Sequence, residues 1–384
     1  MRSWTVRGRG RTTVIGIVWG LCAAALLAGR SLAQTASPRP LKTQNVFLIV
    51  SDGLRWQEIF TGADSLLMDE EHGGIWESKD TLRRAFWRAT PAERRAALFP
   101  FLWGTVARSG QLIGNQLEGS VAHVANGLAF SYPGYNEMLT GSPDPRINAN
   151  DFGPNPNVTV FEWLNAKPDL HGQVAVYGTW STFKDIFNQG RSHLPMLVGW
   201  DPPYSGSALT PRQRLLNELY ASTIRFDDET SYDEFMQIPV LEQLASTHPR
   251  VVFVGYGETD NWAHAERYDL VLRSAHAFDE YVRQLWNTVQ SVPSYRGRTT
   301  FIITCDHGRG SGLVDWKEHG VDQKGSDNIW VAVIGPDTPP AGERRNIAPV
   351  IQAQIAATIA ALVGKDYQHD VPSAAAPIAE VLPH

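Results

Sequence analysis

Acidic and histidine side chains recur in this sequence just after short, continuously apolar runs. Their carboxylate and neutral imidazole groups are the natural ligands of Zn²⁺, or of Mn²⁺ in a harder site. Two such ions about 4 Å apart can clamp the attacking and the leaving oxygen of an in-line displacement. The sequence therefore predicts a site for two divalent metal ions. The candidate ligands are Asp52, Asp260, His264, Asp306, His307 and His319.

The spacing of these residues favours shared metal ions. Asp260 and His264 are four positions apart, so one helical turn would aim both side chains at a single ion. Asp306 and His307 are adjacent, which in a loop lets both turn toward one ion. Taken alone, the Asp-Gly pair that begins at Asp52 would be an ordinary turn. It becomes a candidate ligand because the other motifs follow it.

Ser131 is the candidate nucleophile. It lies directly before a predicted helix start and beside the turn-forming pair Pro133-Gly134. In that place its hydroxyl can face a phosphate at the N-terminus of the helix. Serine is a weak nucleophile at its ordinary pKa, and coordination to a metal ion activates it. The alternative for Ser131 is an ordinary helix cap.

Buried strands must position these side chains. Five short apolar runs have the length and continuous apolarity of strands that are covered on both faces, and helical patterns alternate with them. The expected fold class is therefore α/β, a doubly wound, mostly parallel sheet with helices on both faces. All strand carboxyl ends then gather along one edge, so the six candidate ligands can converge. The predicted strands are 45–50, 173–177, 251–256, 299–304 and 329–334, and the predicted helices are 90–107, 233–245, 266–289 and 347–363.

The first 33 residues have the pattern of a signal peptide. Basic residues precede the apolar stretch 14–28, and Ser31-Leu32-Ala33 supplies the small residues that a signal peptidase requires. The apolar stretch is shorter than the roughly 20 residues that span a bilayer, which argues against a retained anchor. We therefore expect residues 1–33 to be removed and the protein to be periplasmic or secreted, without a stable membrane anchor.

The remaining chain is expected to hold a linker, 34–44, and a single catalytic domain, 45–384. Segments at about 64–89 and 190–230 lack a strand–helix rhythm and are expected to be insertions that form a cap. Removal of the leader takes away five arginines and no acids, so the formal charge of −6 becomes −11. Such a chain has no global basic field to attract nucleic acid. Cys305 would be the only cysteine left, which excludes an internal disulfide.

In their order along the chain, these motifs resemble those of the alkaline phosphatase superfamily, in particular its type I phosphodiesterase/nucleotide pyrophosphatase branch. The resemblance runs from about Asn45 to Gly335. Ser131 stands where that branch usually has a threonine followed by an aromatic residue and proline. The motifs that carry the resemblance are Val50-Ser-Asp52-Gly-Leu-Arg55, Ser131-Tyr-Pro133, Asp260-Asn-Trp-Ala-His264, Asp306-His307-Gly308 and His319-Gly320.

The resemblance implies metal-dependent hydrolysis of a phosphodiester or a small organic phosphate through a covalent phosphoserine at Ser131. It also implies which residues share each ion. One set would bind the ion that holds Ser131, and the other the ion that activates water and receives the leaving oxygen. The branch has an asparagine that binds a phosphoryl oxygen, for which Asn150 is the nearest candidate and Asn148 the other. The implied sets are Asp52, Asp306 and His307 for the first ion, and Asp260, His264 and His319 for the second.

The sequence departs from the family pattern in ways that keep alternatives open. A serine nucleophile is typical of the phosphomonoesterases, whereas the Tyr132-Pro133 flank is typical of the diesterases. No complete third, Mg²⁺-type ligand set is evident, and Glu258 has no assigned role. The sulfatase motif needs an arginine where this chain has Tyr135, which argues against formylglycine chemistry. A sulfatase-like or phosphomutase-like member of the superfamily, and a non-catalytic exported binding protein on the same scaffold, remain alternatives.

Overall fold

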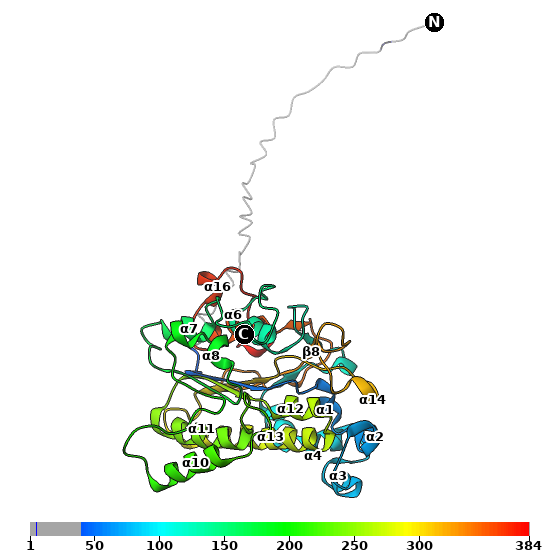
Figure 1. Ribbon diagram of the computed structural model, residues 1–384. Helices are drawn as coiled ribbons and strands as arrows, with labels where there is room; N and C mark the ends of the chain where they lie inside the picture. The colour runs from blue at the N-terminus through cyan, green and yellow to red at the C-terminus, as the bar shows by residue number, and fades with distance from the viewer. Residues whose placement is uncertain (1–4, 6–39, 384) are drawn as a thin grey trace. The chain divides into compact units, whose positions relative to one another are not determined.

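An eight-stranded sheet forms the centre of the protein (Figure 1). In the computed structural model, which describes Thr5 and residues 40–383, the strand order is β10-β2-β9-β7-β1-β6-β4-β5. β9 is antiparallel to both of its neighbours, and the other pairs are parallel. The strands are β1 Asn45–Ser51, β2 Gln111–Ile113, β4 Val174–Gly178, β5 Met196–Val198, β6 Val251–Tyr256, β7 Thr299–Thr304, β9 Val331–Ile334 and β10 Gly342–Glu343.

The strands in the middle of this sheet confirm the prediction that the continuously apolar runs form buried strands. β1 lies between β6 and β7, and every one of its residues is buried. Strands covered on both faces have no solvated side, so their sequences are apolar throughout rather than alternating. The predicted run 329–334 divides at Trp330 between β9 and a second, small sheet of three strands. That sheet contains β11 Val350–Ile351, β3 Ala122–His123 and β8 Asn328–Ile329.

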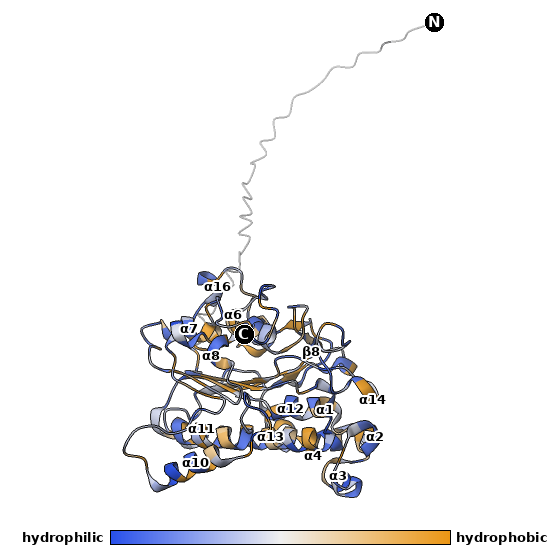
Figure 2. Cartoon of the chain, viewed as in Figure 1, coloured by the Kyte–Doolittle hydropathy of each residue, from blue (hydrophilic) through white to orange (hydrophobic). Residues whose placement is uncertain are grey.

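Helices cover both faces of the central sheet, as predicted. Figure 1 shows α6, α7 and α8 on one face and α11, α12 and α13 on the other, and Figure 2 shows the hydrophobic strands between them. The longer helices are α1 Trp56–Thr61, α3 Lys79–Phe86, α4 Pro91–Leu98, α6 Ser131–Thr140, α7 Val160–Asn165, α10 Pro211–Ser222, α11 Asp233–Thr247, α12 Glu258–His264, α13 Tyr268–Ser291 and α15 Gln354–Leu362. The short helices are α2 Glu70–Gly73, α5 Ala107–Ser109, α8 Phe183–Ile186, α9 Gln189–Ser192, α14 Gly312–Asp315 and α16 Tyr367–Asp370.

Two predicted helices are shorter than expected. The helix predicted over 90–107 begins as expected, with a capping box between Thr90 and Glu93, but α4 ends at Leu98 and a wider helical turn precedes α5. The helix predicted over 347–363 begins only at Gln354. Pro349 cannot donate a backbone hydrogen bond within a helix, and the next two residues pair with β3 instead.

The predicted leader 1–33 and most of the linker lie outside the described residues. Leu41–His384 form one compact unit. Within it, the segment 64–89 holds α2 and α3, whereas 190–230 holds α10 and also β5, the edge strand that pairs with β4. Over the range 40–383, no helix combines the length and the apolarity needed to cross a membrane.

Candidate active site

The six predicted ligands come together at one edge of the sheet. β1, β6 and β7 are parallel neighbours, so their carboxyl ends lie side by side. Asp52 follows β1, α12 follows β6 after one residue, and Asp306 with His307 follows β7. The potential ligand atoms form two groups, and within each group they lie within 4.8 Å of one another. The first group is Asp52, Asp306 and His307, and the second is Asp260, His264 and His319.

Each member of the first group is held by a hydrogen bond at one atom and turns its other atom toward the group, with His307 Nε2 3.3 Å from Asp52 Oδ1 and 3.5 Å from Asp306 Oδ2. Asp52 accepts a hydrogen bond at Oδ2 from the Tyr135 hydroxyl at 3.2 Å, and Asp306 accepts one at Oδ1 from the Gly53 amide at 3.0 Å. His307 Nδ1 lies 2.8 Å from the Gly308 carbonyl, to which it donates. The opposite atoms, Asp52 Oδ1 and Asp306 Oδ2, are buried without a hydrogen-bond partner. Buried carboxylate oxygens are rarely left unpaired, so this arrangement fits a bound cation.

Charge in this buried group reinforces that fit. Asp306 and His307 are fully buried, and Asp52 is 6% exposed. Burial, together with the neighbouring Asp52, raises the pKa of Asp306 to about 8. Burial by itself would lower the pKa of His307, but the neighbouring acids Asp306 and Asp52 together outweigh it and raise that pKa to about 9. Without a metal ion, protons on Asp306 and His307 offset the packed negative charge, and a divalent ion would take the place of those protons.

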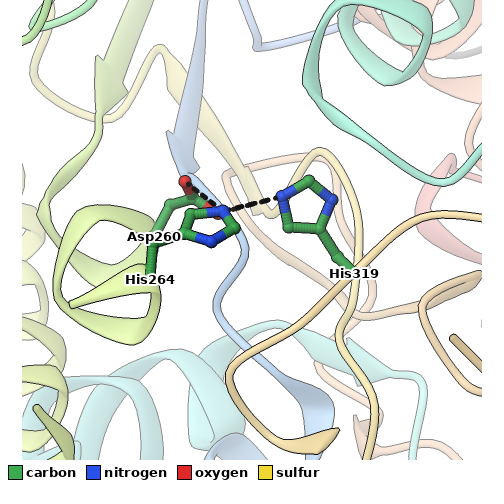
Figure 3. A group of neighbouring side chains, drawn as sticks. All are labelled: Asp260, His264 and His319. Carbon is green, nitrogen blue, oxygen red and sulfur yellow. Dashed lines mark hydrogen bonds and ion pairs between the residues drawn. The ribbon is translucent and has the colours of Figure 1, made fainter. Parts of the chain in front are cut away.

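The second group is more open and contains two neutral imidazoles. His264 Nε2 lies 2.9 Å from His319 Nε2 and 3.4 Å from Asp260 Oδ2, so the three side chains point to one place (Figure 3). Burial lowers the pKa of His264, and burial together with His307 lowers the pKa of His319. His319 Nδ1 is buried without a partner. Neutral imidazoles of this kind are the form that binds Zn²⁺.

Ser131 is the first residue of α6, one position further into the helix than predicted. Its Oγ lies 3.3 Å from His307 Nε2, and its side chain is nearly buried. α6 is buried along its whole length. In its first turn the Tyr132 amide donates to Asn150, the Gly134 amide donates to the Phe130 carbonyl, and Pro133 has no amide hydrogen. The positive end of the helix dipole favours negative charge at this end.

Asn150 lies beside the nucleophile. Its Oδ1 accepts a hydrogen bond from the Tyr132 amide at 3.0 Å, which leaves the amide nitrogen Nδ2 free to donate. Both candidates are exposed, but Asn150 lines the cavity described below and Asn148 does not. Of the two asparagines, the structure therefore brings Asn150 to the site.

Arg309 was not predicted, yet it is buried at the centre of the site. Its guanidinium donates to the Asp260 carboxylate and to the Lys317 carbonyl, and its Nε has no partner. Burial lowers its pKa to about 9. Gly53 makes room for this side chain, because a Cβ at Gly53 would lie 2.9 Å from Arg309 Nε. The only signal in the sequence was its position two residues after His307, in the same loop.

Glu258 does not join the metal site. It begins α12 but belongs to neither ligand group and does not line the cavity. Burial, with the neighbouring Asp233, raises its pKa to about 10. Asp233 in turn accepts a hydrogen bond from the Gly257 amide at 3.0 Å. Glu258 is therefore a buried acid that stays uncharged near neutral pH.

A cavity of about 230 Å³ opens onto both ligand groups. Trp180 forms part of its wall, whereas the two tryptophans that flank ligands in the sequence, Trp56 and Trp262, are not lining residues. The cavity is small by the standard of ligand sites, which suits a small substrate. The lining residues are Asp52, Ser131, Asn150, Trp180, Asp227, Glu229, Thr230, Gly257, Asp260, Asn261, His264 and His319.

Comparisons with known proteins agree with the fold. No protein-family model and no curated protein matches the chain. Among solved structures, the lipoteichoic acid synthase LtaP from Listeria monocytogenes is 10% identical with a TM-score of 0.50, over 84% of this chain and 72% of LtaP. A protein of the alkaline phosphatase superfamily from Vibrio parahaemolyticus is 15% identical with a TM-score of 0.48, over 85% and 69%. A Mg-bound mutant of TAB5 alkaline phosphatase is 15% identical with a TM-score of 0.45, over 85% and 100%.

At such low identity the likeness concerns the fold alone. The strand order and the helices on both faces confirm the doubly wound, mostly parallel α/β fold that the sequence predicts, and the likeness to LtaP agrees with it.

Proposed function

We propose that this protein hydrolyses phosphate esters with the help of two divalent metal ions, through a covalent phosphoserine at Ser131. The observation that carries the proposal is the position of the Ser131 hydroxyl. It lies at the start of a buried helix, 3.3 Å from a member of the first ligand group, and faces a cavity that the second group also lines. A nucleophile between two ligand groups is the arrangement that an in-line displacement needs.

Two divalent ions, when bound, supply the positive charge that activates the serine hydroxyl and water and stabilises the departing oxygen. The two groups of three would hold them, and their imidazoles favour Zn²⁺, with Mn²⁺ as the second choice. Ser131 Oγ loses its proton and attacks phosphorus, and the alcohol leaves with a proton. Water then cleaves the phosphoserine, which releases the phosphate and restores the hydroxyl.

Other residues position the phosphoryl group. The N-terminus of α6 presents the positive end of the helix dipole to the phosphoryl oxygens. Asn150 Nδ2 is free to donate to one of them. The cavity volume of about 230 Å³ favours a small organic phosphate or a small diester over a large polymer. We also propose that the protein reaches this substrate outside the cytoplasm, because residues 1–33 have the pattern of a signal peptide.

The main competing function is that of a sulfatase-like enzyme. Such an enzyme would keep the metal ions and the fold but transfer a different group. Tyr135 argues against it: where the sulfatase motif needs an arginine, this chain has a buried tyrosine that donates its hydroxyl proton to Asp52. A binding protein without activity is the other alternative, and it predicts ligand binding that survives removal of the metal ions.

The direct test compares p-nitrophenyl phosphate, bis-p-nitrophenyl phosphate and p-nitrophenyl sulfate. Wild-type protein loaded with Zn²⁺ or Mn²⁺ would be measured beside Ser131→Ala, with Ser222→Ala on α10 as the matched control. We expect hydrolysis of at least one phosphate ester that Ser131→Ala abolishes and the control retains. Faster hydrolysis of the sulfate, or equal rates for Ser131→Ala and wild type, would overturn the proposal.

A further inference from the structure

The two ligand groups form one side of the cavity. Another part of its wall is formed by Trp180, Asp227 and Glu229. We propose that this wall selects phosphate esters whose organic group carries a positive charge, such as an ammonium alcohol. The inference rests on the proposed function and names its substrate class.

Residues outside this wall also indicate that the cavity binds a ligand. Asp52 lines it, is 6% exposed, and has a carboxylate oxygen, Oδ1, without a hydrogen-bond partner. The nucleophile Ser131 lines it as well. Within a cavity of about 230 Å³, the organic group of a molecule whose phosphate lies at these residues is close to the remaining wall.

The wall is held in place by the main chain. The segment that follows α10 returns to the sheet edge, where Trp180 and Thr230 form an antiparallel bridge. The Ser181 amide donates to the Glu229 carbonyl at 2.9 Å, and the Ser231 amide donates to the Thr179 carbonyl at 2.8 Å. The insertion predicted at 190–230 thus contributes its last residues to the active site.

The side chains of this wall are also fixed. The Asp227 carboxylate accepts a hydrogen bond from the Thr230 amide at 3.0 Å, and the Trp180 indole nitrogen donates to Glu229 Oε2 at 3.3 Å. Trp180 packs edge-on against Phe183, with ring centroids 5.9 Å apart. These contacts bring an indole and two carboxylates together on one wall of the cavity.

Charge decides which organic group this wall would accept. None of the lining residues is a lysine or arginine, and across residues 40–383 neither Asp227 nor Glu229 has an ion-pair partner. The nearest arginine in the sequence, Arg225, pairs instead with Asp228 at 3.7 Å and stacks on Trp200. Further phosphates on a substrate would be repelled here. An ammonium group would be attracted by both carboxylates and by the aromatic ring of Trp180.

The test uses two diesters of equal shape and different charge. p-Nitrophenyl phosphorylcholine carries a quaternary ammonium, and p-nitrophenyl 3,3-dimethylbutyl phosphate replaces its nitrogen with carbon. We expect wild-type, Zn²⁺-loaded protein to have a kcat/KM about tenfold higher for the choline ester, from two partly exposed carboxylates and one aromatic ring. The ratio should fall several-fold in the double variant Asp227→Asn/Glu229→Gln, which keeps only the contribution of Trp180, and Asp228→Asn, the matched control, should leave it unchanged.

A second measurement does not depend on turnover of these esters. Tetramethylammonium should inhibit hydrolysis of bis-p-nitrophenyl phosphate competitively, and several-fold less strongly in the double variant. Equal kcat/KM values for the two diesters, or a higher value for the neutral one, would overturn the inference while leaving the proposed function intact. Failure to hydrolyse any phosphate ester would instead remove the proposed function, and this inference with it.

Discussion

The two ligand groups differ in how they are built, although each contains three residues. In the first group, hydrogen bonds from Tyr135, from the Gly53 amide and to the Gly308 carbonyl fix one atom of each ligand. In the second group the ligands contact mainly one another, and Arg309 is the additional partner of Asp260. The first group is therefore organised before a metal ion binds, whereas the second depends more on the ion.

Exposure follows the same division. The His307 side chain is fully buried, and that of His264 is 43% exposed. A buried, pre-organised group suits the ion that fixes the nucleophile, because its ligands cannot relax when charge moves to Ser131. An open group suits the side where water enters and the alcohol leaves. We therefore expect the first group to bind its metal ion tightly and the second group to exchange its ion more readily.

The largest effect is expected from Asp306→Asn in the buried group. Asparagine keeps the size and can still accept the Gly53 amide, but it removes the charge that holds the ion. Activity should fall on the order of 10³-fold or more, since even partners outside a ligand set cost about 10–100-fold. The measurements are kcat with the better phosphate ester and zinc content per chain, with the exposed Asp80→Asn as control. Loss of one ion per chain is expected; a variant with both ions and near-normal activity would contradict this assignment.

A smaller, reversible effect is expected from His264→Asn in the open group. Activity should fall by roughly 10–100-fold at limiting Zn²⁺ and recover in part when Zn²⁺ is in excess, because the remaining ligands still define the site. His369→Asn, another exposed histidine, is the control. A loss that excess Zn²⁺ does not change at all would mean that the two groups do not differ as described.

The smallest effect is a pH dependence of stability in the metal-free protein. The folded-state pKa of Asp306, about 8, lies above its ordinary value of 3.8, so the folded state binds this proton more tightly than the unfolded state. Its contribution is therefore present at acid pH and is lost as the pH rises from 3.8 through about 8. His307 has the same sign, and its contribution is lost as the pH rises from 6.5 through about 9.

Urea unfolding with a chelator present would measure this dependence. The free energy of unfolding of wild type, relative to Asp306→Asn, should fall by more than about 1 kcal/mol across that range. Bound Zn²⁺ should remove most of the fall, because the ion replaces the protons. A difference between the two proteins that is flat or rises with pH would show that Asp306 is not a buried, strained acid in the metal-free state.

The convergence of the ligands was predictable because it follows from local patterns. Each of the apolar runs 45–50, 251–256 and 299–304 forms a parallel strand, and parallel neighbours end at one edge. Chemistry at those ends could therefore be assigned to one place without knowing the strand order. Ser131 was predictable for a similar reason, since the turn signals beside it mark the start of a helix.

The rest of the site depends on packing between distant segments. Arg309 and Trp180 carry no motif, and their roles arise from contacts with Asp260 and with the loop near Glu229. The strands β2, β5 and β10 have only two or three residues, too few to show a hydrophobic period. Pairing with neighbours, rather than their own sequence, makes these segments strands.

The most direct test of the central claim is to trap the covalent intermediate. Zn²⁺-loaded protein would be mixed with the better p-nitrophenyl ester, quenched in acid within the first turnover and analysed by peptide mass spectrometry. We predict one added phosphoryl group on the peptide that contains Ser131. The amount of phosphorylated peptide should equal the amount of p-nitrophenol released in the initial burst. Ser131→Ala should give neither signal. A Ser131→Ala protein that turns over the ester at the wild-type rate, with no phosphorylated serine in either protein, would contradict the account.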